Sequence, residues 1–117
     1  MAHPDFAYKV TPRALFDTAR ARGRFVGAPV DLGDGFIHLS TAEQLRETLE
    51  RYFAGQRDLV LFSVRVADFG PAMIWEPSRG GALFPHLYAT LPMSAVQRIA
   101  AIEVGADGAV VLPDWVK

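Results

Sequence analysis

Residues 58–66 read DLVLFSVRV, and six of these nine residues are aliphatic or aromatic. An apolar run of this length, rich in valine and leucine and bounded by polar residues, is typical of a β-strand buried on both faces. It is the clearest strand signal in the chain. The elements before and after it determine the class of fold.

A helix is predicted near the start of the chain, after a short strand over Phe6–Val10. Thr11 can act as a hydroxyl N-cap, and Pro12 suits the first helical turn because its φ is fixed. Gly23 supplies the left-handed residue that ends such a helix. The next segment, Gly27–Gly35, is predicted as a long loop because it is rich in glycine, proline and aspartate.

A second helix is predicted after a strand over Phe36–Leu39. Residues 40–43 read STAE, a capping box in which Ser40 and Glu43 satisfy free backbone amides reciprocally. An apolar stripe at helical period follows, and Gly55 ends the helix.

After residue 70 the chain is predicted to form mostly short strands. GADG at residues 105–108 lies between Val96–Val104 and Ala109–Leu112, which indicates a hairpin. Together, these elements predict an α+β fold, with two N-terminal helices packed on a mixed, mainly antiparallel sheet. A length of 117 residues favours a single domain, residues 1–117.

Composition excludes several classes of protein. Twelve basic and thirteen acidic residues give a formal charge of -1, which argues against a dedicated binder of nucleic acid or anionic membranes. The absence of cysteine excludes disulfides, thiolate metal sites and a cysteine nucleophile. Because no signal core or membrane-length apolar run is present, we expect a soluble cytoplasmic domain. The oligomeric state is left open.

The first candidate site segment is FIHLS, residues 36–40. Strand alternation sends Phe36, His38 and Ser40 to one face. His38 would stand at the end of a strand and Ser40 at a helix N-terminus, whose amides favour an anion such as phosphate. The alternative is that His38 is a hydrogen-bonded sheet residue and Ser40 only a cap.

The second candidate segment is IWEPSRGG, residues 74–81. Trp75 could stack on a base, and Glu76 could act as a general base or bind ribose hydroxyls. Arg79 carries a guanidinium suited to phosphate or carboxylate. The alternative is an exposed loop in which a Glu76–Arg79 ion pair contributes little.

The third candidate segment is FPHLY, residues 84–88. His86 and Tyr88 share a strand face, where they could orient a polar ligand or exchange protons. They could equally be a buried hydrogen-bonded pair that fixes the sheet register. His38, His86 and Glu76 could form a metal face, but their spacing matches no metal motif. We therefore expect no metal and no required cofactor.

Three blocks together resemble the family catalogued as domain of unknown function 952. The blocks stand at Asp34–Ser40, Trp75–Pro77 and Phe84–Tyr88, and the resemblance covers nearly the whole chain. That family is grouped by fold with ADP-ribosyltransferases, including RNA 2′-phosphotransferases, which are similar over His38–Ala42. The resemblance implies an ADP-ribosyltransferase-like fold and a ligand such as NAD, as a substrate, or ADP-ribose.

Two function hypotheses follow. In the first, the chain transfers or cleaves ADP-ribose in one polar pocket, with Glu76, His38 and His86 as catalytic residues. Ser40, Trp75, Arg79 and Tyr88 would bind the ligand. In the second, the chain is a non-catalytic module for a small anionic metabolite or a protein partner. Residues 8–11, YKVT, favour the second, because related transferases carry histidine or arginine there. If all three blocks are structural, neither hypothesis holds.

Overall fold

The computed structural model describes residues 3–117, apart from the side chain of Arg79. Its α-helices are α1 (Arg13–Arg22), α2 (Pro29–Asp34) and α3 (Ala42–Tyr52). The strands are β1 (Phe6–Pro12), β2 (Arg24–Phe25), β3 (Ile37–His38), β4 (Leu59–Arg65), β5 (Met73–Pro77), β6 (Leu83–Leu87), β7 (Leu91–Pro92) and β8 (Val96–Ile102). Short 3₁₀ segments η1 (Val66–Ala72), η2 (Arg79–Gly81) and η3 (Met93–Ala95) connect the later strands.

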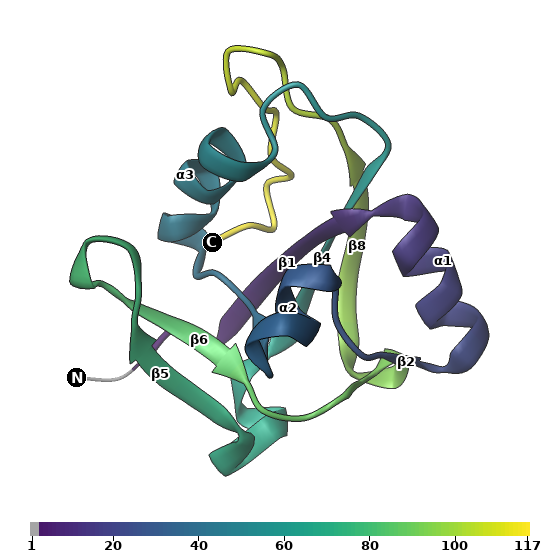
Figure 1. The fold of residues 1–117 in the computed structure, drawn as a ribbon, viewed down its shortest axis with the longest axis vertical. Helices are drawn as coiled ribbons and strands as arrows, with labels where there is room; N and C mark the ends of the chain where they lie inside the picture. Colours follow the sequence, from purple (N-terminus) through teal and green to yellow (C-terminus); the bar gives the residue numbers. More distant parts are fainter. Residues whose placement is uncertain (1–2) are drawn as a thin grey trace.

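The strands form three small sheets (Figure 1). One has the order β1-β4-β8, another the order β3-β6-β5, and β2 pairs with β7. Every pairing among the described residues is antiparallel, so the α+β class is confirmed without the parallel component of a mixed sheet. None of the helices in this part of the chain is long and apolar enough to cross a membrane.

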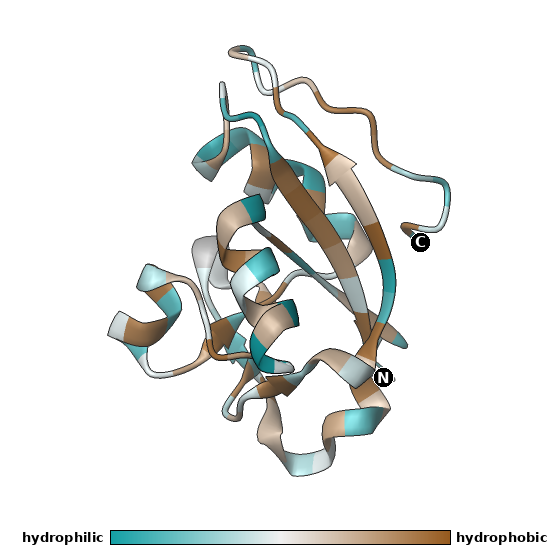
Figure 2. Ribbon diagram, turned by 90° about the vertical axis from the view of Figure 1, so that its right-hand side faces the viewer, coloured by the Kyte–Doolittle hydropathy of each residue, from teal (hydrophilic) through white to brown (hydrophobic). Residues whose placement is uncertain are grey.

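Strand β4 is buried on both faces, as its sequence predicts. Val60, Phe62 and Val64 point into one apolar cluster, together with Phe16 of α1. Leu59 and Leu61 point into a second cluster, which includes Leu45 and Leu49 of α3. Figure 2 shows the hydrophobic residues concentrated along the central strands. The two predicted helices therefore cover opposite faces of the β1-β4-β8 sheet.

Both predicted helix starts are displaced by one residue. Thr11 is wrong as the N-cap of α1: it continues β1 opposite Val60, and Pro12 takes the N-cap position. Ser40 is wrong as the N-cap of α3, because the chain is still tied to β1 there through a bridge to Tyr8. The capping box is formed instead by Thr41 and Gln44, whose reciprocal contacts measure 3.2 and 3.0 Å.

Two further predictions are corrected. The loop predicted over Gly27–Gly35 contains α2, which begins at Pro29 and ends at Gly35 with a φ of 85°. The hairpin after β8 is only half formed. Its turn is present, with hydrogen bonds of 2.9 Å from Gly108 to Gly105 and 2.8 Å from Gly105 to Ala109. Ala109–Leu112 then runs on without strand pairing.

Candidate functional site

Two histidines face each other on the outer side of the β3-β6-β5 sheet. Ile37 pairs with Leu87, and both side chains enter the core. His38 pairs with His86 one position along, so alternation places both imidazoles on the opposite face. Their ring centroids lie 5.5 Å apart. The ring of Phe36 lies against both, 4.5 Å from His38 and 4.2 Å from His86.

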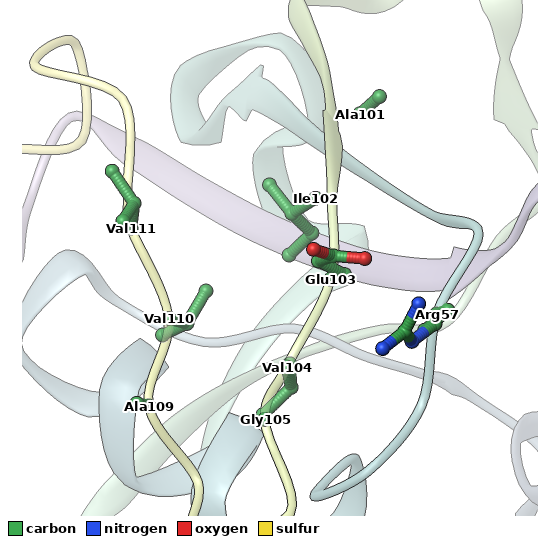
Figure 3. Close-up of a pocket in the computed structure, with 9 residues that line it drawn as sticks. All are labelled: Arg57, Ala101, Ile102, Glu103, Val104, Gly105, Ala109, Val110 and Val111. Atoms are coloured by element: carbon green, nitrogen blue, oxygen red, sulfur yellow. The ribbon is translucent and has the colours of Figure 1, made fainter.

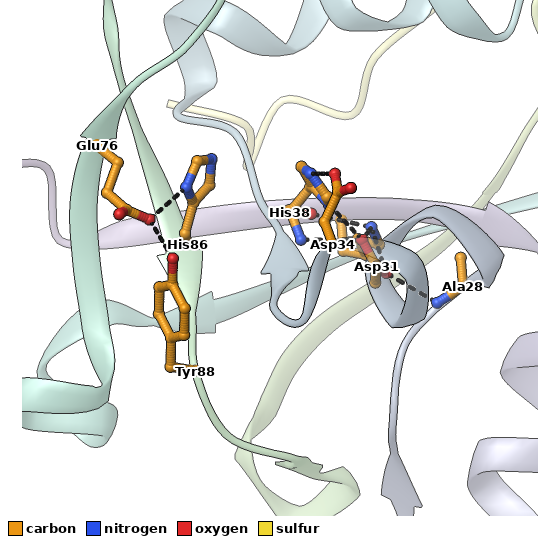
Figure 4. A network of polar contacts seen from close by, with 8 residues as sticks. Ala28, Asp31, Asp34, His38, Glu76, His86 and Tyr88 are labelled. Atoms are coloured by element: carbon orange, nitrogen blue, oxygen red, sulfur yellow. Dashed lines mark hydrogen bonds and ion pairs between the residues drawn. The ribbon is translucent and has the colours of Figure 1, made fainter.

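The imidazole of His38 is held between two carboxylates of α2 (Figure 4). Nδ1 lies 2.7 Å from Oδ1 of Asp31, and Nε2 lies 2.9 Å from Oδ2 of Asp34. A neutral imidazole has only one N–H, whereas an imidazolium donates through both nitrogens. The geometry therefore suits a protonated His38 flanked by two ionised carboxylates.

Asp31 is the buried centre of this network, with its side chain only 1% exposed. Its oxygens accept hydrogen bonds from the backbone N–H groups of Ala28 and His38, at 2.8 and 3.0 Å. The ammonium of Lys9, on β1, lies 3.0 and 2.9 Å from the two oxygens. Lys9 also donates to the carbonyl oxygen of His38 at 2.9 Å. Three acceptors around one ammonium satisfy all of its donors.

The charge state of Asp31 follows from these partners. Burial raises the pKa of Asp31, but the hydrogen bonds from His38 and the charge of Lys9 outweigh burial and lower the pKa to about 2. Burial lowers the pKa of Lys9, and the carboxylate of Asp31 opposes that shift. The contacts around both groups are those of an ammonium–carboxylate pair.

A measurable pH dependence follows for Asp31. Because its pKa is about 2 in the folded chain, against an ordinary value of 3.8, the ionised form stabilises the fold at all pH values above about 4. That stabilisation, about 2 kcal/mol from this carboxyl, is lost as the pH falls from about 4 to about 2. An NMR titration of the Asp31 carboxyl carbon should give a midpoint near 2. A midpoint near 4 would contradict the assignment.

A second polar group lies beside the first, on β5 and β6. Oε1 of Glu76 lies 2.8 Å from Nδ1 of His86 and accepts a hydrogen bond of 2.6 Å from the hydroxyl of Tyr88. The Tyr88 hydroxyl and then the His86 imidazole lower the pKa of Glu76, and the carboxylate raises the pKa of Tyr88. Glu76 is thus an ionised acceptor that fixes both side chains.

The contact with Glu76 determines which nitrogen of His86 carries a proton. Since an ionised carboxylate only accepts, Nδ1 donates to Glu76, and in the neutral form of the ring Nε2 keeps its lone pair. No other described residue makes a hydrogen bond to this ring, and the side chain is only 7% exposed. A buried imidazole oriented by a carboxylate, with its second nitrogen unused, can take a proton from a bound hydroxyl.

The seven predicted site residues do not all meet. His38, Glu76, His86 and Tyr88 gather on the outer sheet face (Figure 4). Trp75 lies on the opposite face from Glu76, because neighbouring strand residues alternate, and its ring stacks on His3 with centroids 4.0 Å apart.

The hydroxyl of Ser40 is buried and lies 3.1 Å from that of Thr48 on α3, so it is directed toward the helix. The side chain of Arg79 lies outside the described part of the structure.

Sequence reasoning missed three residues that build the site: Lys9, Asp31 and Asp34. It placed Phe36 on the face of His38 but gave it no role. One signal was available. Lys9 lies between Tyr8 and Val10 in a predicted strand, and a lysine in a buried strand needs a carboxylate partner. The sequence does not say which aspartate supplies it.

Neither of two hollows in the structure is lined by the histidine pair. One, of about 600 Å³, lies between the end of β8 and residues 109–111, with Arg57 and Glu103 at its edge (Figure 3). The other, of about 290 Å³, lies beside α1. The chemistry of the histidine face, rather than depth, marks it as the candidate site. Among the described residues, no three histidine, aspartate or glutamate side chains are placed to hold a metal ion.

Family membership is established by comparison with known proteins. Residues 10–99 match the model of a family described as "Protein of unknown function (DUF952)". The chain belongs to this family, as the resemblance of its three sequence blocks predicts. No curated protein matches the chain.

Solved structures of one relative share the fold. The crystal structure of protein CC0527 from Caulobacter crescentus is 50% identical, with a TM-score of 0.89 over 95% of this chain and 97% of that chain. Its solution NMR structure is 51% identical, with a TM-score of 0.79 over 90% of each chain. The residues matched by the family model, 10–99, include both histidines of the pair.

Proposed function

We propose that the outer face of the β3-β6-β5 sheet binds a nucleotide-type ligand of the ADP-ribose class, NAD or ADP-ribose. One observation carries the proposal: Oε1 of Glu76 is shared by His86 and Tyr88, whereas Oε2 has no described partner. A fixed carboxylate with one free oxygen is suited to accept a hydrogen bond from a ribose hydroxyl. Such a carboxylate supports the likeness to ADP-ribosyltransferase-like proteins that the sequence blocks imply.

The local charge favours one part of such a ligand. Three carboxylates, of Asp31, Asp34 and Glu76, lie among only two described cationic groups, Lys9 and a protonated His38. An excess of negative charge suits the cationic nicotinamide ring or a ribose that develops positive charge, and it disfavours a pyrophosphate. The pyrophosphate would need a further partner, for which Arg79 is the candidate from sequence.

As an enzyme, the site would cleave the bond between ribose C1′ and the nicotinamide nitrogen of NAD. The electron pair of that bond leaves with nicotinamide, and the oxygen of water or of an acceptor hydroxyl bonds to C1′. The proton of that oxygen passes to Nε2 of His86, and the carboxylate of Glu76 stabilises the positive charge on the ribose. His38 would contact the ligand through the face of its ring, because both of its nitrogens are engaged by Asp31 and Asp34.

A panel of ligands tests the proposed binding. ADP-ribose or NAD at about one hundred times its dissociation constant should stabilise the chain by roughly 2.7 kcal/mol, measured as a rise in unfolding temperature. Nicotinamide and AMP, each carrying part of the ligand, should give smaller shifts. His86→Ala and Glu76→Gln should abolish the response.

The matched control is Glu47→Gln, which changes an exposed carboxylate paired with Arg51 on α3. This variant should respond like the unmodified chain. If no member of the panel shifts the unfolding temperature, the nucleotide proposal fails.

A specific observation favours a second candidate, a binding module without turnover. In β1, the stretch comparable with the one where related transferases carry a histidine or arginine is residues 8–11, and its one basic residue, Lys9, has its ammonium engaged by Asp31 and the His38 carbonyl. Lys9 is therefore not available to clamp NAD for catalysis, which favours a module that binds a small anionic metabolite or a protein partner without turnover. Release of nicotinamide from NAD separates the two candidates. If the chain is a binding module, NAD raises its unfolding temperature but no nicotinamide is released, whereas an enzyme releases nicotinamide.

A further inference from the structure

A second surface, on the α1–α2 side of the molecule, contains an apolar hollow with a cationic edge. The hollow measures about 290 Å³. Its apolar wall includes Leu15, Phe25, Val26 and Leu32, and Arg22 and Arg24 also line it. It is formed where the chain leaves α1 through β2 and enters α2, away from the face that carries the histidines.

Two large apolar side chains that line this hollow are open to solvent. Val26 and Leu32 are 39 and 63% exposed. Helix α2 is fixed by its other side, where Asp31 is buried and bonded to Lys9 and His38. Leu32 is therefore not needed to hold the helix in place. Grouped exposed apolar residues of this kind mark interaction surfaces.

The arginines at the hollow lack acidic partners. Arg22 and Arg24 are exposed and form no ion pair within the described residues. By contrast, Arg13 at the start of α1 is paired with Asp58. Guanidinium groups bind carboxylates through two parallel hydrogen bonds, so an acidic partner complements this edge.

We infer that the surface around Arg22, Arg24, Val26 and Leu32 docks an acidic peptide segment that inserts an aliphatic side chain into the hollow. A peptide can place its carboxylates at the two arginines and its apolar group against Leu32. A membrane is a poorer fit, because binding to anionic lipid needs a broad basic field and this chain carries a net charge of -1. The inference does not depend on the nucleotide proposal.

Fluorescence anisotropy with a labelled peptide of three Glu-Glu-Leu-Leu repeats tests the inference. The full chain should bind it, and the affinity should fall as salt is raised. The Arg22→Glu/Arg24→Glu variant and Leu32→Asp should each bind at least tenfold more weakly. Arg98→Glu and Val111→Asp, at exposed positions on the other side of the sheet, should bind like the unmodified chain. The changed side chains are exposed, so unfolding temperatures should stay close to that of the unmodified chain.

Three results would overturn the inference. The first is equal affinity in all variants, and the second is equal binding of a matched peptide with lysine in place of glutamate. The third is binding to phosphatidylglycerol vesicles with none to the acidic peptide, which would identify a lipid surface instead.

Discussion

Asp31→Asn should lower the free energy of unfolding by about 3–5 kcal/mol, the range expected when one partner of a buried ion pair is removed. The loss has two sources. Lys9, which is 7% exposed, keeps a buried charge without its counterion. Both carboxylate oxygens also accept hydrogen bonds, from Ala28 and His38 among others. The asparagine amide replaces one of these oxygens by an NH₂ group, which cannot accept them.

Urea denaturation at neutral pH measures this effect, and the chain supplies a matched control. Asp58 forms an ion pair of 2.7 Å with Arg13, but its side chain is 76% exposed. Asp58→Asn should therefore change the free energy of unfolding by about 1 kcal/mol or less. Equal losses in the two variants would mean that the Asp31 network does not hold β1, α2 and β3 together.

Phe62→Ala should lower the free energy of unfolding by about 3–5 kcal/mol, as expected for deleting a fully buried aromatic ring. Phe62 is 0% exposed at the centre of β4. Its ring centroid lies 5.6 Å from that of Phe16 on α1 and 5.8 Å from that of Phe25 on β2. The cavity would remove contacts that β4 makes with both α1 and β2. The expected loss is a large part of the 5–15 kcal/mol by which a typical domain is stable.

Thermal or urea unfolding of Phe62→Ala should be compared with that of Val111→Ala. Val111 is 90% exposed, so its truncation should change the free energy of unfolding by about 0.5 kcal/mol or less. If Phe62→Ala cost no more than Val111→Ala, β4 would not be the strand on which the core is built.

The core could be predicted from sequence because it rests on short-range periodicity. Nothing but apolar density was needed to identify β4, and the two faces of that strand follow from alternation. The same alternation predicts that His86 and Tyr88 share a face, as their common contact with Glu76 confirms. The local sequence pattern is sufficient to predict features that depend on a single helix or strand.

The rest of the site depends on pairings between distant segments. Lys9 and Asp31 are 22 residues apart, and only the tertiary fold brings them together. The displaced cap of α3 has the same origin, because an isolated bridge to Tyr8 holds Ser40 in an extended conformation, and the helix cap falls on Thr41 instead. Trp75 and Glu76 are adjacent in sequence but lie on opposite faces of β5. The prediction that both line one pocket is therefore wrong.

The most direct test of the proposed site uses the three histidines as NMR probes. On addition of ADP-ribose, the imidazole nitrogen signals of His86 and His38 should shift with one common dissociation constant. The signals of His3, which stacks on Trp75 away from Glu76, should stay in place and serve as the internal control. If saturating ADP-ribose moved none of these signals, or moved only those of His3, the proposal that the outer sheet face binds this ligand would be wrong.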